Sequence, residues 1–450
     1  MDDQNVNMPD VEEIEALLAA NKLDELKTLL HDVHPADIAD LLDQLDADEA
    51  VQVFNLFSIE TASEILDESG SLVRQEIVEK VDDEKLADLL DELPMDDAAE
   101  FLDDLPDQVA NRLIGLMEPE EAYDVRELLS YEDETAGRLM TRDVAALRAN
   151  WTVSATFEFL RSLEDTETLH YLYVVDATGR LIGILPIRDL IMAQPDQTIE
   201  KIMTPDIIAA PVTIDQEHLA EMMARYDFFA MPVVDEDGRL QGVVTLDDVL
   251  DVFEEEVTED IQRLGGSEPL DQPYFAVSVF DMFKKRVGWL LLLFLAATLT
   301  GTVINLYTEQ LQAAIALSLF IPLIIGTGGN AGSQTVATII RAITLDEVRL
   351  GNLWQAWRKE VSVGLLLGIA MAGLGFVRAV TWGEGVKIGL IVGLTLPLVV
   401  IWAITVATIV PTVADRFRID PAVISGPMIT TIVDTTGLMI YFQLATIILN

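Results

Sequence analysis

Residues 421–449 read PAVISGPMITTIVDTTGLMIYFQLATIIL, a run long and apolar enough to cross a membrane as one helix. Its only charged residue is Asp434, near the middle. A carboxylate near the centre of a bilayer costs about 2.5 kcal/mol or more. It persists where it faces water, a partner or a cation. Because the chain is strongly acidic, we expect Asp434 to bind a cation within the membrane.

Four other apolar runs precede this one, at residues 287–307, 311–340, 361–380 and 386–410, so the sequence predicts five membrane spans. With the N-terminus inside, nine basic residues lie in the inner loops, against only Arg378 and Lys387 outside. The nine are Lys284, Lys285, Arg286, Arg341, Arg349, Arg358, Lys359, Arg416 and Arg418. The bias predicts a multi-pass protein of the cell (plasma) membrane with a cytoplasmic N-terminus and an extracytoplasmic C-terminus. Five spans can hardly enclose a hydrated ion, so we expect a homodimer with the ion path on its two-fold axis.

The formal net charge of −49 is concentrated in one part of the chain. Residues 273–450 carry a net +2, and residues 1–272 carry −51. Such a head repels phosphates, which excludes a nucleic-acid binder. The chain has no cysteine, which excludes disulfides and thiolate metal sites. The acidic surface is either solvated, as in a salt-tolerant proteome, or binds cations.

Residues 1–130 contain short apolar-periodic segments about a dozen residues apart. The sequence LADLLDELP at 86–94 is echoed by AAEFLDDLP at 98–106, and residues 36–45 are a looser copy. This self-similarity predicts a small α-solenoid.

Residues 138–253 contain a clearer duplication. The sequence YVVDATGRLIG at 173–183 recurs as PVVDEDGRLQG at 232–242. Each copy predicts two strands joined by a Gly-containing turn, followed by a helix at 187–192 or 247–253. A Met-Thr pair opens each copy, Met140-Thr141 and Met203-Thr204. The arrangement predicts two copies of one α+β module.

Residues 247–263 join this duplication to the spans, and they predict a helix dense in carboxylates. Its acids are Asp247, Asp248, Asp251, Glu254, Glu255, Glu256, Glu259 and Asp260. Positions 248, 251, 255 and 259 share one face, where like charges destabilise a helix. We expect this helix to need bound cations to stay ordered.

The second span contains PLIIGTGGNAGSQ at residues 322–334. Four glycines with Asn330 and Gln334 predict a break in the helix at membrane depth, which is tolerated beside a water-filled path. The alternative is close helix packing by small residues.

The duplicated module resembles a tandem pair of CBS domains, and the whole chain resembles the MgtE family of magnesium channels and transporters. The family's Gly-Thr-Gly-Gly-Asn signature matches Gly326 to Asn330, and its last-span signature matches Asp434-Thr435-Thr436-Gly437 with Tyr441. The resemblance implies a multi-domain chain: an acidic helical α-solenoid domain at 1–130, tandem α+β CBS domains at 138–253, a connecting (plug) helix and linker at 254–272, and an all-α five-span transmembrane domain at 273–450.

The resemblance also implies that Asp434 holds hydrated Mg²⁺ on an ion path with Gly326, Gly328, Gly329, Asn330 and Gln334, in a homodimer surrounded by membrane lipid. It implies a gate closed by cytoplasmic Mg²⁺. The positions that match its metal ligands are Glu64, Asp96, Glu100, Asp215, Glu217, Asp227, Asp248, Asp251, Glu256, Glu259, Asp260 and Asp420. Where the family often has Asn before Pro427, this chain has Gly426, so that side-chain contact is missing.

CBS domains often bind ATP or another adenine nucleotide, and Tyr171, Arg188, Asp189 and Phe228 match positions that would frame an adenosine. The family's ribose-binding pattern, a Thr three residues before an Asp, matches Thr245 and Asp248, whereas the first copy has Pro186 at the Thr position. We expect no enzyme activity, because an intramembrane aspartyl protease needs two facing acids and only Asp434 lies within a span. The sequence leaves a channel and a carrier coupled to Na⁺ or H⁺ both open.

Overall fold

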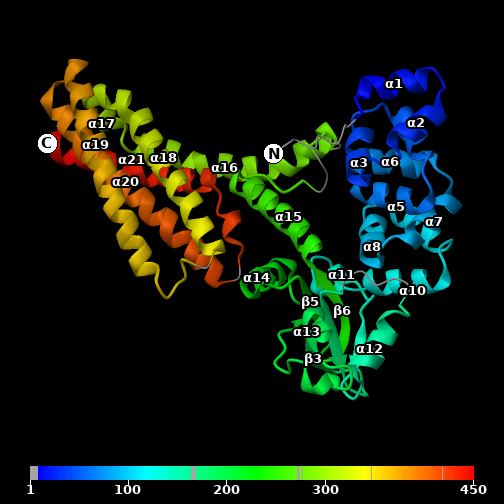
Figure 1. Cartoon of the computed structure of the whole chain (residues 1–450). Coiled ribbons are helices and arrows are strands. Elements are labelled where there is room, and N and C mark those ends of the chain that lie inside the picture. Colours follow the sequence, from blue (N-terminus) through cyan, green and yellow to red (C-terminus); the bar gives the residue numbers. More distant parts are fainter. Residues whose placement is uncertain are drawn as a thin grey trace, which may run out of the picture. The chain divides into compact units, whose positions relative to one another are not determined.

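The computed structural model describes residues 9–163, 169–270, 274–275, 277–345, 347–417 and 419–449 (Figure 1). The chain divides into two compact units, Met1–Glu255 and Glu256–Asn450. Arg418 and Pro273, which entered the predictions on orientation and domain boundaries, lie outside the described residues.

The first unit begins with a stack of short helices. Polar side chains start several of them: Asp10 and Ser58 accept hydrogen bonds from backbone N–H groups of the first turns of α1 and α5. The helices are α1 Val11–Ala19, α2 Leu23–Leu30, α3 Pro35–Leu42, α4 Ala47–Phe54, α5 Ile59–Glu68, α6 Ser71–Lys80, α7 Asp83–Glu92, α8 Met95–Asp103, α9 Asp107–Ile114 and α10 Pro119–Leu128. The predicted helical domain is confirmed.

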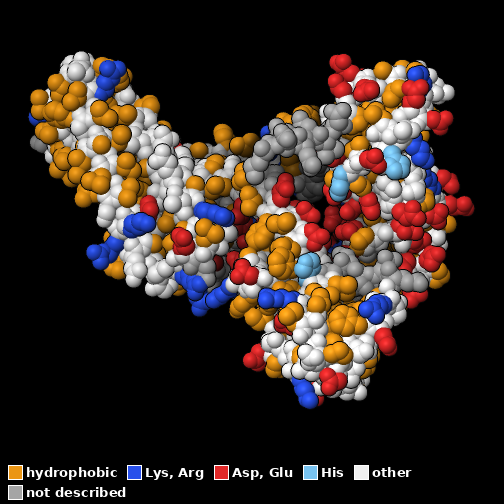
Figure 2. Space-filling model, in the orientation of Figure 1, with side chains coloured by type: hydrophobic (Ala, Val, Ile, Leu, Met, Phe, Trp, Pro, Cys, Tyr) orange, Lys and Arg blue, Asp and Glu red, His pale blue; other side chains and the backbone are white. Residues whose placement is uncertain are grey.

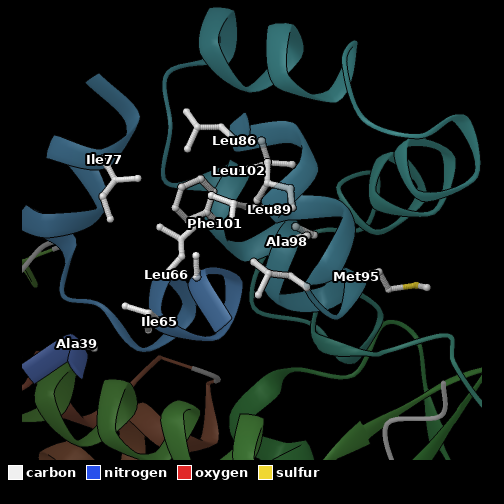
Figure 3. Packing of buried hydrophobic residues seen from close by; sticks show 14 of the residues in the cluster. Ala39, Ile65, Leu66, Ile77, Leu86, Leu89, Met95, Ala98, Phe101 and Leu102 are labelled. Atoms are coloured by element: carbon white, nitrogen blue, oxygen red, sulfur yellow. The ribbon is translucent and has the colours of Figure 1, made fainter. Parts of the chain in front are cut away.

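The apolar residues of these helices form one core. Figure 3 shows Phe101 of α8 surrounded by Leu66 of α5 and Leu86 of α7, and all three side chains are buried. Asp and Glu side chains cover much of the outer surface of this part in Figure 2. The repeats at 86–94 and 98–106 are therefore successive helices with apolar faces turned inward.

Two similar three-stranded sheets follow, each with one parallel and one antiparallel pair. The first has β1 Ala146–Arg148, β2 Tyr171–Val175 and β3 Leu181–Pro186, and the second has β4 Ala210–Pro211, β5 Ala230–Val234 and β6 Leu240–Thr245. The helical elements are α11 Ala136–Leu139, α12 Val153–Leu160, α13 Ile187–Met192, the 3₁₀ helix η1 Ile199–Lys201 and α14 Gln216–Tyr226. Gly179 and Gly238 take positive φ values of 84° and 76° in the two turns. The predicted duplication is confirmed.

The two copies pair crosswise at the Met-Thr segments. Thr141, which opens the first copy, exchanges backbone hydrogen bonds of 2.8 and 2.9 Å with Val243 in the second copy's β6. Thr204, which opens the second copy, exchanges bonds of 3.0 and 2.9 Å with Ile184 in the first copy's β3. Each sheet is therefore completed by a segment that belongs to the other repeat.

The predicted acidic helix is one continuous helix, α15 Leu246–Leu264, which leads from the first unit into the second. The second unit then contains α16 Val279–Leu306, α17 Thr308–Ala313, α18 Ala316–Thr344, α19 Leu353–Thr381, α20 Gly385–Arg416, the 3₁₀ helix η2 Pro421–Val423 and α21 Gly426–Leu449. Among the described residues, five of these helices are long and apolar enough to span a membrane: α16, α18, α19, α20 and α21. The prediction of five spans is confirmed.

The predicted break in the second span is wrong. The segment 322–334 lies inside α18, which is helical from Ala316 to Thr344. Its glycines instead allow close packing: a Cβ at Gly328 would lie 2.7 Å from Val399 Cγ1 of α20 and 2.8 Å from Val433 Cγ1 of α21. The alternative reading of small-residue packing therefore accounts for Gly328, and for Gly329, whose Cβ would meet Thr430 at 2.8 Å.

Gly328→Ala should therefore lower the free energy of unfolding, whereas Gly326→Ala should leave it nearly unchanged. A Cβ at Gly328 overlaps two valines and should cost about 1–3 kcal/mol, whereas a Cβ at Gly326 meets nothing within 4 Å. Thermal unfolding of the two detergent-solubilised variants measures the difference. Equal melting temperatures would contradict the close helix contact.

Candidate metal and ion-path sites

Asp434 lies about two turns into α21, which packs against α16, α18 and α20. Its Oδ1 is buried and accepts no hydrogen bond from the described residues. The neighbouring hydroxyls donate elsewhere: Thr430 to the carbonyl of Gly426 at 3.0 Å and Thr431 to that of Pro427 at 2.9 Å. A buried carboxylate oxygen without a donor is costly, so this position favours a bound cation or hydrated ion.

The other predicted ion-path residues separate into two groups. Gly326, Asn330 and Gln334 are four residues apart on α18 and share one exposed stripe. Gly328 and Gly329 are buried against α20 and α21. Exposed amides on a spanning helix are unfavourable against lipid, so the stripe faces water or another protein surface.

The first unit brings together several carboxylates from α5, α8 and α15. Asp67 is partly buried; desolvation raises its pKa to about 6, Arg74 opposes that rise, and Glu68, Asp251 and Asp248 add to it. Desolvation likewise raises the pKa of Glu100, where Asp67 and Asp251 contribute. Three predicted ligands, Glu100, Asp248 and Asp251, therefore share one electrostatic neighbourhood with Asp67. Sequence reasoning missed Asp67, because a single Asp in an amphipathic helix carries no motif.

Asp248 has a local role as well. Its Oδ2 accepts hydrogen bonds from the Thr245 backbone N–H at 3.0 Å and the Thr245 hydroxyl at 2.6 Å, near the start of α15. Desolvation raises the pKa of this carboxyl, and the bonds from Thr245 oppose that rise. The Thr245–Asp248 pair that matched a ribose-binding pattern thus bonds internally here.

The remaining predicted ligands of the first unit are more dispersed. Glu64 is exposed on α5, and Asp96 is buried in α8. Asp215 caps the N-terminus of α14, where its carboxylate accepts from the backbone N–H of Glu217 at 3.1 Å, whereas Asp227 lies at the other end with a φ of 55°. Asp227 is therefore separated from Asp215 and Glu217 by the length of α14, about 16 Å.

The second unit gathers four predicted ligands around Arg263. Arg263 forms ion pairs with Glu259 and Asp420. Desolvation raises the pKa of Asp260, and Asp420 and Glu256 raise it further. Asp420 also caps η2, accepting from the Ala422 backbone N–H at 2.7 Å. Sequence reasoning counted these acids but missed Arg263, the cation among them.

Within the described parts of the chain, no three Asp, Glu or His side chains already stand close enough to hold a metal ion. The acids therefore lie near one another without forming a closed coordination shell. A divalent cation would have to draw them closer, or a second subunit would have to add ligands.

The predicted nucleotide residues lie on both copies of the duplicated module. The rings of Tyr171, on β2, and Phe228, just before β5, meet edge to face with centroids 6.1 Å apart. Arg188 and Asp189 are exposed in the first turn of α13. The aromatic pair offers an apolar edge, and the charged pair offers polar contacts.

Comparisons with known proteins agree over most of the chain. The family model for the MgtE divalent cation transporter matches residues 321–444, that for the MgtE intracellular N domain matches 33–134, and that for the CBS domain matches 136–196 and 199–255. The magnesium transporter MgtE of Thermus thermophilus is 40% identical over 340 residues, 75% of each chain. That of Bacillus subtilis is 32% identical over 331 residues, 73% of each chain.

Solved structures match about half of the chain. The cytosolic domain of the Mg²⁺ channel MgtE in complex with ATP is 37% identical, with a TM-score of 0.51, covering 54% of this chain and 100% of that one. The soluble part of a magnesium transporter is 31% identical with the same TM-score, covering 55% of this chain and 99% of that one. With five hydrophobic spans, an N-terminal helical domain, a CBS pair and these relatives, the chain is a multi-pass membrane protein that belongs to the MgtE family of divalent cation transporters.

Proposed function

We propose that this chain forms a homodimeric Mg²⁺ channel that cytoplasmic Mg²⁺ closes. The observation that carries the proposal is the buried Oδ1 of Asp434, which lacks a donor among the described residues. Mg²⁺ dehydrates reluctantly and binds one or two carboxylates while keeping several waters. Two copies of Asp434 on a two-fold axis supply two negative charges for its two positive ones. The magnesium transporters among the relatives support this choice of ion.

The ion path runs, on this proposal, along the exposed α18 stripe of Gly326, Asn330 and Gln334. Gly328 and Gly329 contribute by letting α18 approach α21, the helix that carries Asp434. Selectivity then depends on Asp434 and on the amides and backbone oxygens near it. We propose no catalytic step.

Chain organisation follows the four predicted regions, 1–130, 138–253, 254–272 and 273–450. The N-terminus lies in the cytoplasm and the C-terminus outside. The bias of basic residues supports this orientation, and Figure 2 shows Lys and Arg side chains gathered mainly at one end of the membrane helices.

The gate operates by linkage: Mg²⁺ that binds the closed arrangement more tightly shifts the population toward closed. The proposed ligands are the twelve predicted carboxylates outside the membrane. The neighbourhood of Glu100, Asp248 and Asp251 supports a site in the first unit, and that of Glu256, Glu259, Asp260 and Asp420 supports one in the second. The absence of a preformed site among the described residues fits ligands that Mg²⁺ draws together.

The end of α15 is the coupling element. Arg263 pairs with Asp420, Asp420 caps η2, and α21 begins three residues after η2 ends, at Gly426. A movement of α15 would thus be transmitted to α21, the helix that carries Asp434, through the Arg263–Asp420 ion pair and the Asp420 cap of η2.

A nucleotide at the CBS pair is a separate part of the proposal. The related cytosolic domain was solved with ATP, and the Tyr171–Phe228 pair offers an edge for an adenine. We propose ATP or another adenine nucleotide there, with Arg188 and Asp189 as polar contacts.

Recordings from the purified protein in planar bilayers, with Mg²⁺ on one side, separate a channel from a carrier. Discrete current steps support the channel. A saturable flux that shows no current steps and depends on a Na⁺ or H⁺ gradient would contradict the channel and indicate a secondary transporter.

Millimolar Mg²⁺ should protect the first unit and α15 of the full-length protein from protease. Ions that bind only the compact arrangement stabilise it by mass action. Protection should be greatest over residues 247–263 and the link at 131–139. Equal protection by K⁺ at the same ionic strength would show charge screening instead of site binding and contradict the gate.

A further inference from the structure

Arg74 of α6 is held beside the C-terminus of α5 by two backbone acceptors. Its Nε donates to the Leu66 carbonyl at 3.2 Å, and its Nη2 donates to the Asp67 carbonyl. Both carbonyls belong to the last turn of α5, where helix carbonyls lack partners four residues on and the dipole favours a cation; the Leu66 carbonyl also accepts from the Ser69 backbone N–H at 3.3 Å. The half-buried guanidinium is therefore placed by its own helical domain, independently of α15.

The charge of Arg74 acts on carboxylates from three helices. Burial raises the pKa of Asp67 on α5, of Glu100 on α8 and of Asp104 just after α8, and the charge of Arg74 is the largest influence that opposes the rise at each. Burial also raises the pKa of Asp251 on α15, with Asp247, Glu254 and Glu68 adding to the rise and Arg74 opposing it. Arg74 thus lies among carboxylates of the helical domain, and α15 adds Asp251 to them.

We propose that Arg74 is a resident cation of this interface and sets the Mg²⁺ concentration at which the helical domain and α15 close together. The proposal rests on the proposed function, in which Glu100, Asp248 and Asp251 bind regulatory Mg²⁺. A guanidinium stays charged at all physiological pH values and is tied here to the backbone, so it neither dissociates nor varies with the ion concentration. Mg²⁺ that binds at this interface is therefore repelled by the positive charge of Arg74.

The sign of the effect follows from the charges. Asp67, Glu100 and Asp104 accompany Arg74 whether or not α15 is docked, so their attraction largely cancels between the two states. Docking adds an attraction between Arg74 and the single charge of Asp251. Mg²⁺ binding adds a repulsion between Arg74 and two charges. Removing the charge of Arg74 should therefore tighten Mg²⁺ binding by roughly threefold, for charges about 10 Å apart at an effective dielectric constant of about 20 and a Debye length of about 10 Å.

The test uses the full-length protein in detergent and measures the Mg²⁺ midpoint of protease protection at constant ionic strength. Arg74→Gln keeps a donor for the α5 carbonyls but removes the charge, and its midpoint should fall by roughly threefold. Arg74→Lys keeps the charge and should leave the midpoint unchanged. Lys22→Gln is the matched control, because it makes the same change in net charge at an exposed residue paired with Glu25.

Arg74→Met gives a second arm, because it keeps an unbranched apolar stem in place of the arginine stem and also removes the charge, so its midpoint should fall as well. An unchanged or raised midpoint in Arg74→Gln overturns the proposal. If Arg74→Gln does not fold, an unchanged or raised midpoint in Arg74→Met overturns it. A wild-type protein that Mg²⁺ does not protect overturns both the proposed gate and this role of Arg74, whereas normal wild-type protection with no shift in the variants overturns the role of Arg74 alone.

Discussion

Asp434→Ala should lose nearly all Mg²⁺ flux while remaining folded and dimeric. Asp434 is the only acid within the five apolar runs of the sequence, and no described hydrogen-bond donor satisfies its buried Oδ1. Its removal takes away the carboxylate that would hold hydrated Mg²⁺ on the path. It also removes a costly group from the membrane interior, so the melting temperature should stay the same or rise. Uptake of Mg²⁺ into proteoliposomes measures the flux.

Asp281→Ala provides the matched control for this experiment. Asp281 lies in the first turn of α16 and pairs with Lys284 at 2.7 Å. Its loss also removes one carboxylate from a spanning helix, but at the end of the helix, so flux should be close to that of the wild type. Normal uptake by a folded Asp434→Ala protein would contradict the assignment of Asp434 to the ion path.

Neutralising one face of α15 should give a pore that stays open in high internal Mg²⁺. The change is Asp248→Asn, Asp251→Asn and Glu259→Gln, which removes three proposed ligands. Asparagine at 248 keeps an oxygen that can accept the hydrogen bonds from Thr245, so the start of α15 should survive. Without these carboxylates, Mg²⁺ loses much of its preference for the closed arrangement, and currents should persist at millimolar internal Mg²⁺.

A competing effect has the opposite sign. Fewer like charges on α15 could let the helix dock without any ion, which would leave the pore closed even when Mg²⁺ is absent. We expect ligand loss to dominate, because a carboxylate–Mg²⁺ contact is local, whereas repulsion between exposed charges is screened beyond about 8 Å at physiological salt. Asp196→Asn, Asp206→Asn and Glu236→Gln remove three exposed acids that are not proposed ligands and should leave gating unchanged. A folded ligand-face triple variant that is closed without Mg²⁺ would show that α15 gates by charge alone.

Periodicity and turn chemistry were enough to predict much of the architecture. The alternating β-branched runs around Gly179 and Gly238 predicted the two strand pairs, and apolar run length predicted the five spans. Glycine content misled at 322–334, because α18 remains helical where other helices pack closely against its missing side chains. Composition records how many glycines a helix has, but not what lies opposite them.

The site residues that could not be predicted from the sequence are those whose neighbours are set by tertiary packing. Asp67, Arg74 and Arg263 occur in ordinary amphipathic sequence, and nothing local distinguishes them from solvated surface residues. Arg74 becomes significant because the turn after α5 brings it to that helix's last carbonyls. Arg263 becomes significant because Asp420, more than 150 residues later, lies beside it. Asp434 was predicted from its own sequence context, as a single charge in an apolar run, whereas the other predicted ligands came from the resemblance to the family.

During synthesis, Thr141 leaves the ribosome about 100 residues before Val243, the residue with which it pairs. At about 5–20 residues per second, the first repeat waits roughly 5–20 s for its missing strand contact. Ile184 likewise waits for Thr204 before its own sheet is complete. The two repeats must therefore mature together after both have been translated, and a chain cut between them would leave two fragments that each lack a contact only the other can supply.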